Sequence, residues 1–159
     1  CIAAVEHAGV VWMGGDSAAS DESYITTYVE PKVWVNGEFV FGYCDNGRYG
    51  AVLRHTFVPP KVKGNMDKYL TNEFVPKLKE LFNKEAELHA EEEGKYPQIE
   101  FLFGLRGKLY LCDSRYQIGR PHDGFAATGS GTFIATGVLY ANSRLKPRER
   151  IIQALRAAV

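Results

Sequence analysis

Residues 125–141 read FAATGSGTFIATGVLYA, and this stretch decides how the chain is expected to fold. A short apolar run leads into the turn Gly129-Ser130-Gly131, and a run of small and apolar residues follows. We therefore expect a strand, a turn that carries the Ser130 hydroxyl, and then a helix. The turn is not a phosphate-binding loop, which needs GxxxxGK[ST], nor a GxSxG nucleophile elbow, which would need glycines at Thr128 and Thr132.

Strands are expected on both sides of three short turns. The runs beside each turn are enriched in β-branched and aromatic residues. These runs are IAAVEH and VVWMGGDS around Gly9, KVWV and EFVFGYC around Asn36-Gly37, and IEFLFGL and KLYLCDS around Arg106-Gly107. Each pair predicts a β-hairpin, most strongly at Asn36-Gly37.

Helices are expected in the segments between and after these strands. Apolar residues recur at helical spacing over 49–57 and over 70–88, where Pro76 predicts a kink or a restart. Another helix is expected from Pro147 onward. The order strands, two helices, strands, two helices predicts an α+β fold in which two sheets pack between helical layers, a four-layer αββα sandwich.

The composition indicates an ordinary globular protein and excludes several function classes. The 159 residues, read as a single domain over 1–159, carry 19 basic and 19 acidic side chains without a basic stripe, which argues against a nucleic-acid surface. The apolar runs are too short to span a membrane. Because Cys1, Cys44 and Cys112 show no metal-ligand spacing, we expect no metal and no cofactor. The three cysteines also form no paired disulfide framework, which predicts a reducing, cytoplasmic environment.

The printed sequence begins at Cys1, where a thiol and a backbone amine would share one residue. In an N-terminal nucleophile, the amine is the general base for its own side chain. A nearby cation must favour the neutral amine, an acid must orient the cation, and N–H groups must stabilise an oxyanion. Lys32 and Asp16 are the candidate cation and acid, and the Ser130 hydroxyl could face the amine. Backbone N–H groups in GYCDNG, residues 42–47, are the candidate oxyanion hole.

Four motifs in this order resemble the proteasome β-subunit family, which includes the bacterial HslV peptidase. They are GGDSAAS about fifteen residues after the first cysteine, PKVWV, FGYCDNG, and FAATGSGTFIATGVLYA. The resemblance spans nearly the whole chain. It implies an αββα sandwich, hydrolysis of peptides or unfolded proteins through an acyl-enzyme, and assembly into a homo-oligomeric ring. It leaves open whether an ATP-dependent unfoldase is a further partner.

The resemblance also implies roles for individual residues. Cys1 takes the place of the usual threonine nucleophile. Asp16 and Lys32 match the charged pair beside it, and Ser130 matches the serine that supports the α-amine. Asp45 falls where the family has the residue whose N–H forms the oxyanion hole.

Substrate-binding residues follow from the same resemblance. Ser20 falls where a threonine binds the substrate backbone. The residues expected to line the primary specificity pocket are Ala19, Glu30, Trp34 and Tyr43. Glu30 and Tyr43 predict a narrow or polar pocket.

The chain departs from the family pattern at several positions. The nucleophile is a cysteine, the oxyanion glycine is replaced by Asp45 or Asn46, and the arginine two residues after the aspartate is Ala18. The printed chain also ends at Val159, where the family continues into two more strands with a further catalytic aspartate. We expect either a longer natural chain or a trimmed sandwich.

Two alternatives remain open from the sequence. A non-catalytic ring or scaffold subunit would explain Asp45, but such a subunit need not keep a charged pair that is costly to desolvate. A cysteine-type amidase that acts on small amides would also begin with cysteine. The placement of Lys32 and of TGSGT favours the peptidase.

Overall fold

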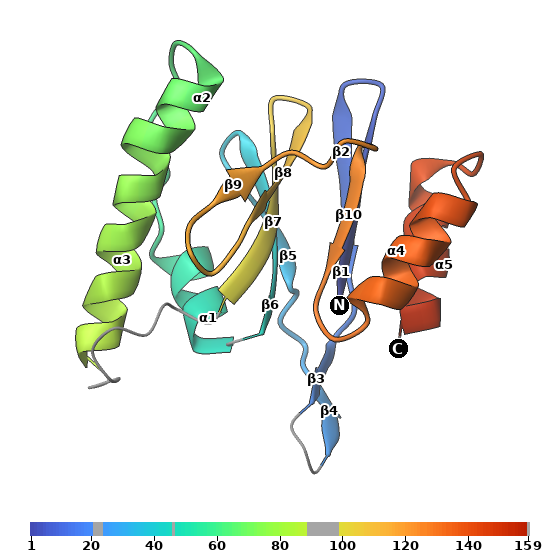
Figure 1. Ribbon diagram of the computed structural model, residues 1–159. Coiled ribbons are helices and arrows are strands. Elements are labelled where there is room, and N and C mark those ends of the chain that lie inside the picture. The colour runs from blue at the N-terminus through green and yellow to red at the C-terminus, as the bar shows by residue number, and fades with distance from the viewer. Residues whose placement is uncertain (21–23, 46, 89–98, 159) are drawn as a thin grey trace.

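The computed structural model describes residues 1–20, 24–45, 47–88 and 99–158. Two antiparallel sheets lie face to face, and helices cover the outer face of each sheet (Figure 1). The strands are β1 (Ile2–His7), β2 (Val10–Gly15), β3 (Ala18–Ser20), β4 (Ile25–Thr27), β5 (Val33–Asn36), β6 (Phe39–Asp45), β7 (Ile99–Leu105), β8 (Lys108–Cys112), β9 (Ile118–Gly119) and β10 (Phe125–Thr128). The helices are α1 (Gly47–His55), α2 (Met66–Tyr69), the π-helix η1 (Leu70–Phe74), α3 (Val75–Leu88), α4 (Thr132–Ala141) and α5 (Pro147–Ala158). The expected four-layer αββα sandwich is confirmed.

The first sheet has the strand order β10-β1-β2, with β1 in the centre. Gly9 has a φ of +73° in the turn between β1 and β2, as the predicted hairpin requires. Both neighbours run antiparallel to β1, so Ile2 is paired with Gly15 on one side and with Thr128 on the other. The beginning of β1 therefore lies beside the ends of β2 and β10.

The second sheet has the strand order β5-β6-β7-β8-β9. Its two predicted hairpins form, at Gly37-Glu38 between β5 and β6, one residue later than the expected Asn36-Gly37 turn, and at Arg106-Gly107 between β7 and β8. Because β5 and β6 are antiparallel, the segment before β5 lies at the same end of the sheet as the last residues of β6.

The helices divide between the two outer faces. Helices α1 and α3 lie on the side of the five-stranded sheet, and α4 and α5 lie on the side of the three-stranded sheet (Figure 1). The predicted restart at Pro76 is not observed, because the backbone stays helical from Met66 to Leu88, with Tyr69, Leu70 and Val75 all in the right-handed helical region. The π-helical turn over Leu70–Phe74 lies directly before Pro76, which lacks the N–H that a regular α-helix would use at this position.

Three groups of buried side chains hold the layers together. Aromatic residues dominate the first group, in which Phe41, Phe74 and Phe103 join the five-stranded sheet to its helices. The second group joins β1 and β10 to α4 and α5, and the third fills the space between the sheets. Of the residues described, no helix combines the length and the apolar character that a membrane crossing requires.

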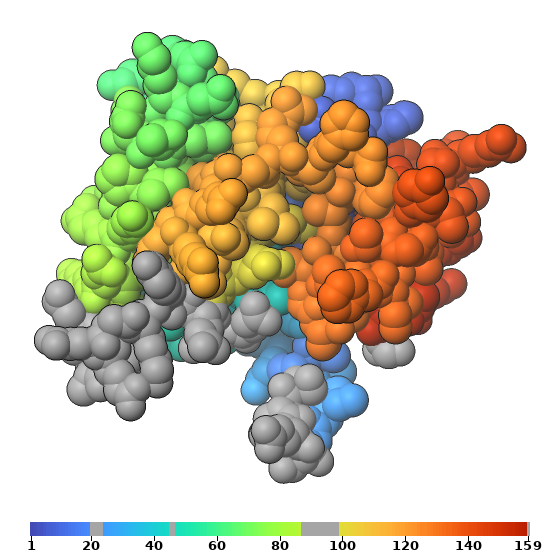
Figure 2. All heavy atoms as spheres, viewed as in Figure 1, coloured from blue at the N-terminus to red at the C-terminus, as the bar shows by residue number. Residues whose placement is uncertain are grey.

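The short strands β3 and β4 form a separate hairpin that the sequence analysis did not predict. Ala18 is paired with Thr27, and Ser20 with Ile25. The hairpin stands out from the two stacked sheets (Figures 1 and 2). Several of its apolar side chains are exposed, including Ile25 at 75% and Tyr28 just after it at 57%.

Candidate active site

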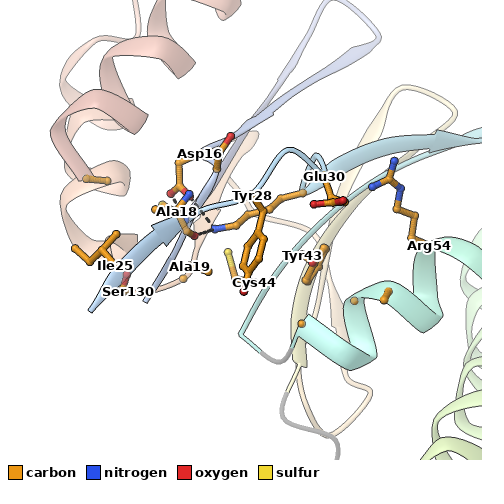
Figure 3. A pocket seen from close by; sticks show the side chains of 18 of the residues that line it. Asp16, Ala18, Ala19, Ile25, Tyr28, Glu30, Tyr43, Cys44, Arg54 and Ser130 are labelled. Atoms are coloured by element: carbon orange, nitrogen blue, oxygen red, sulfur yellow. Dashed lines mark hydrogen bonds and ion pairs between the residues drawn. The ribbon is translucent and has the colours of Figure 1, made fainter. Parts of the chain in front are cut away.

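A cavity of about 810 Å³ opens where residues from both sheets meet. Its volume lies in the range of sites that bind small molecules or side chains of larger substrates. The walls come from the beginning of β1, the segments after β2 and β10, the β3–β4 hairpin, the end of β6 and helix α1 (Figure 3). The predicted catalytic residues among the lining residues are Cys1, Asp16, Lys32 and Ser130.

Asp16 connects two cationic groups in this cavity. Its Oδ2 atom accepts a hydrogen bond from the Cys1 amine, and its Oδ1 atom accepts one from Lys32 Nζ at 2.7 Å. The backbone N–H of Ala18 also donates to Oδ1, at 2.9 Å. Figure 3 shows Asp16 and Ala18 together in the middle of the site. The structure therefore brings together three residues that the sequence predicted as a catalytic set.

The local backbone explains why Asp16 meets Cys1. The backbone N–H of Asp16 donates to the Cys1 carbonyl at 3.1 Å, which extends the β1–β2 pairing by one residue. A Cβ at Gly15 would lie 2.6 Å from Ile2 Cδ1 and 3.4 Å from Lys32 Cβ. The lack of a side chain at Gly15 therefore lets Ile2 and Lys32 lie close to the end of β2.

Lys32 reaches the site from the second sheet. The Lys32 carbonyl accepts a hydrogen bond from the Tyr43 N–H at 3.2 Å, which ties the lysine to β6. Its ammonium also donates to the carbonyl of Ala18. The Lys32 and Asp16 side chains are only 17% and 12% exposed, so solvent screens their pairing weakly.

The charge on Asp16 is stabilised by its partners. Burial acts to raise the pKa of this carboxyl group, because it removes water from the charged form. The hydrogen bonds and positive charges of Lys32 and the Cys1 amine outweigh burial, so the pKa of Asp16 lies below its ordinary value. Asp16 is therefore an anion under all physiological conditions and can orient both cations.

Cys1 and Ser130 are placed less favourably than the charged pair. The Cys1 side chain is 2% exposed, and its Sγ atom lies 3.7 Å from the Ile2 carbonyl oxygen. Ser130 is exposed and lies in the turn before α4, at the cavity wall. Within the described part of the chain, no hydrogen bond joins Ser130 to the Cys1 amine, so its supporting role stays a prediction.

The expected oxyanion hole lies at the junction of β6 and α1. The backbone of Asp45 ends β6 opposite Ile99, and α1 begins at Gly47, a lining residue of the cavity. The alternative residue, Asn46, lies outside the described residues. The role of Asp45 therefore also stays a prediction.

The residues expected to bind substrate are brought only partly to the cavity. Ala19, Glu30 and Tyr43 line it, whereas Trp34 packs against Phe41 and Tyr43 in the aromatic core. Trp34 is therefore a support for the Tyr43 ring rather than part of the wall. Ser20 lies in β3, which places its backbone in the adjacent hairpin.

Tyr43 closes the side of the cavity that faces α1. A Cβ at Gly50 would lie 2.0 Å from the Tyr43 ring, so the ring lies against the helix backbone. Figure 3 shows Glu30, Tyr43 and Arg54 at this end, opposite Ile25 and Ser130. The narrow or polar character expected of the pocket stays a prediction.

Several lining residues were not predicted from the sequence. Arg54 lies on α1, where its Nη1 atom donates to the Pro31 carbonyl at 3.3 Å. Ile25 comes from the unpredicted hairpin, Tyr28 follows it directly, and Cys44 comes from β6. Neither Arg54 nor Tyr28 belongs to a sequence motif, and only the packing of α1 and the hairpin brings them here.

The αββα sandwich is shared with three solved structures. Thiobacillus denitrificans BPH in complex with epoxomicin is 16% identical with a TM-score of 0.74, and the match covers 99% of this chain and 88% of that one. A second structure of Thiobacillus denitrificans BPH is 15% identical with a TM-score of 0.71, and the match covers 99% of this chain and 88% of that one. Eukaryotic HslV from Trypanosoma brucei is 18% identical with a TM-score of 0.66, and the match covers the same shares of the two chains. No protein-family model and no curated protein matches the sequence. At these identities, the similarity establishes the fold alone.

Proposed function

We propose that the protein is an N-terminal-nucleophile peptidase that cleaves peptide bonds through a thioester on Cys1. The observation that carries the proposal is the Asp16 carboxylate, whose two oxygens bind the Cys1 amine and the Lys32 ammonium. These groups lie at the wall of a cavity large enough for a peptide side chain. The fold shared with an HslV, and with a protein described in complex with epoxomicin, supports the same reaction class.

Lys32 would set the protonation state of the amine. A carboxylate paired with the amine alone would hold it as an ammonium ion, which cannot act as a base. With Lys32 on the other carboxylate oxygen, loss of a proton from the amine leaves a neutral Lys32–Asp16 ion pair. The lysine therefore favours the neutral amine without itself taking a proton.

The reaction would proceed in two halves. The Cys1 amine takes the proton of the thiol, and the sulfur attacks the substrate carbonyl carbon while the carbonyl electron pair moves to oxygen. Backbone N–H groups at the β6–α1 junction would stabilise that oxyanion. When the carbon–nitrogen bond breaks, the ammonium gives its proton to the leaving amine and a thioester remains. Water then attacks the thioester with the amine as base, which releases the acid and restores the thiol.

The proposed mechanism requires a free amine on Cys1, so Cys1 must be the first residue of the active protein if the proposal is right. N-terminal sequencing and intact mass of the purified native protein test this directly. Two routes lead to the same terminus, since either methionine removal or self-cleavage of a leader exposes the cysteine. The variant Cys1→Ala separates them, because self-cleavage predicts a retained leader in that variant.

The central experiment is intact mass after treatment with a peptide vinyl sulfone, with Cys1→Ala as the control. One adduct, mapped to Cys1 and absent from the control, is the expected result. A free, reduced Cys1 that forms no adduct would contradict the proposal. A panel of peptides and small amides then separates a peptidase from a cysteine-type amidase.

A second candidate function has a specific observation in its favour. The Cys1 side chain is only 2% exposed, and a thiol so enclosed also suits a subunit without catalysis. In that case the chain would contribute the fold to an assembly and would show neither adduct nor turnover. The charged set at Asp16 favours the peptidase, because a buried charged pair is costly to maintain without a use.

Assembly into a homo-oligomeric ring belongs to the same proposal. Helix α4 exposes Phe133 at 91%, Ile134 at 55% and Tyr140 at 71%. Phe133 and Tyr140 are seven residues apart and lie on one face of the helix. Exposed apolar side chains gathered in this way are typical of protein–protein contacts. Native mass spectrometry measures the number of subunits, and a monomer at micromolar concentration would contradict a ring.

A further inference from the structure

The proposed catalytic groups are divided between the two sheets. Cys1 and Asp16 belong to the three-stranded sheet, whereas Lys32 precedes the first strand of the five-stranded sheet. The side chains that fill the space between the sheets are largely apolar and include Ile2, Ala4, Cys44, Leu102 and Leu109. Apolar burial has no preferred direction, so it does not by itself fix the sheets to the fraction of an ångström that catalysis requires.

A directional contact crosses between the sheets close to the site. Thr128 ends β10, is completely buried, and donates a hydrogen bond from Oγ1 to Glu100 Oε1 in β7. The thiol of Cys44, which is paired with Glu100 across β6 and β7, donates to the Thr128 carbonyl at 3.2 Å. Thr128 is thus bound to the opposite sheet through both its side chain and its backbone.

The residue after Thr128 touches the proposed nucleophile. Gly129 has a φ of +107°, and a Cβ on it would lie 3.1 Å from Cys1 Cα and 3.4 Å from the Cys1 amine nitrogen. The same Cβ would lie 2.8 Å from Cys44 Sγ. The Gly129 carbonyl accepts hydrogen bonds from both the N–H and the hydroxyl of Thr132, which fixes the turn to α4. A shift at Thr128 would therefore pass directly to Cys1.

We infer that Thr128 and Glu100 are positioning residues for the proposed peptidase. Their hydrogen bond holds the turn at Gly129 and Ser130 against Cys1, and it aligns the first sheet with Lys32 on the second. Neither residue lines the cavity, so they act through the turn and not on the substrate. The inference rests on the proposed function for its catalytic meaning, but the alignment of Cys1 can be measured separately.

The test compares Thr128→Val, which keeps the shape but removes the hydroxyl, with Thr128→Ser, which keeps the hydroxyl. We expect Thr128→Val to lower kcat for a peptide substrate by roughly ten- to a hundred-fold at a KM within about two-fold, because alignment rather than binding is lost. Thr128→Ser restores most of kcat. Glu100→Gln, whose amide oxygen still accepts the hydrogen bond, gives a smaller loss in the same direction and serves if Thr128→Val does not fold.

Leu109→Val is the matched control for general weakening between the sheets. Leu109 is buried in the same interface, but its N–H donates to Glu6 and so lies far from the site. Glu6 is five residues after Cys1, which is about 17 Å at the rise of a β-strand. This variant should lower thermal stability and leave kcat unchanged within about two-fold. If Leu109→Val reduces kcat as much as Thr128→Val at equal stability, the hydrogen bond has no special role and the inference is wrong.

A second readout separates the inference from the proposed function. The rate of Cys1 alkylation by iodoacetamide, followed by peptide mass, needs no turnover. A lower rate in Thr128→Val that returns in Thr128→Ser supports the inference even if no peptide is cleaved, in which case only the proposed function fails. Cleavage and alkylation that are both unchanged in Thr128→Val overturn the inference and leave the proposed function intact. A wild-type protein that is neither cleaving nor alkylated at Cys1 overturns both.

Discussion

Replacing Lys32 by methionine is the sharpest test of the charge arrangement at Asp16. The substitution keeps the length of the side chain and removes its charge. Lys32 Nζ lies 2.7 Å from one Asp16 oxygen, and the Cys1 amine binds the other oxygen. The two nitrogens are therefore no more than about 7 Å apart, where an effective dielectric constant of about 20 gives a repulsion of roughly 2 kcal/mol.

That repulsion sets the size of the expected effect. Because about 1.4 kcal/mol corresponds to a factor of ten, loss of this interaction in Lys32→Met corresponds to roughly thirty-fold. The kcat/KM for a peptide substrate should therefore fall by about that factor. The lost hydrogen bonds to Asp16 and Ala18 should cost about 1–3 kcal/mol of stability, which leaves the protein folded.

The assay is kcat/KM across a pH series, with thermal unfolding measured on the same samples. Lys77→Met is the matched control, because Lys77 forms an exposed pair with Glu80 at 2.9 Å and lies on α3. Such a pair contributes about 0–1 kcal/mol, so this variant should keep its activity and its pH profile. A folded Lys32→Met protein with kcat/KM within three-fold of wild type would refute the general-base scheme.

Three further predictions concern single residues. Gly129→Ala should lower stability by about 1–3 kcal/mol in urea unfolding and reduce labelling of Cys1, because the added Cβ would lie 2.8 Å from Cys44 Sγ at a φ of +107°. Because folding lowers the pKa of Asp16, the charged carboxylate stabilises the folded protein fully above pH 3.8, the ordinary pKa of the group, and this stabilisation is lost as the pH falls below that value. The difference in unfolding free energy between wild type and Asp16→Asn should therefore be constant from pH 7 to 5 and shrink near pH 3. Burial and neighbouring acidic groups raise the pKa of Cys112 to about 12, so iodoacetamide at pH 8 should leave Cys112 unmodified in the folded protein and modify it in urea.

The local elements were largely determined by the sequence. The hairpins at Gly9 and Arg106-Gly107 formed where predicted, and the hairpin expected at Asn36-Gly37 formed with its turn one residue later, because the glycines of these turns readily adopt a positive φ. Pro76 was expected to kink or restart the helix, and the structure instead has a π-helical turn directly before the proline within a continuous helical segment. These are short-range effects, so the residues that cause them are visible in the sequence itself.

The candidate site depended on long-range packing. The sequence proposed Cys1, Asp16 and Lys32 as a set, and the tertiary structure brought them into contact because antiparallel pairing places the beginning of β1 beside the end of β2. The hydrogen bond between Thr128 and Glu100 had no sequence signal, since the two residues lie 28 positions apart in different sheets. For Trp34, the strand was predicted correctly, but the side chain packs against Phe41 in the aromatic core instead of lining the pocket.

The sequence by itself determined the order of strands and helices apart from the β3–β4 hairpin, most of the turns between them and the chemical identity of the proposed catalytic groups. Only the tertiary structure decided how the two sheets face each other, which side chains enclose the cavity and which contact aligns Gly129 with Cys1. The physical reason is that turn geometry and helix periodicity act between near neighbours, whereas a cavity between two sheets is defined by side chains that meet only after the whole chain has packed.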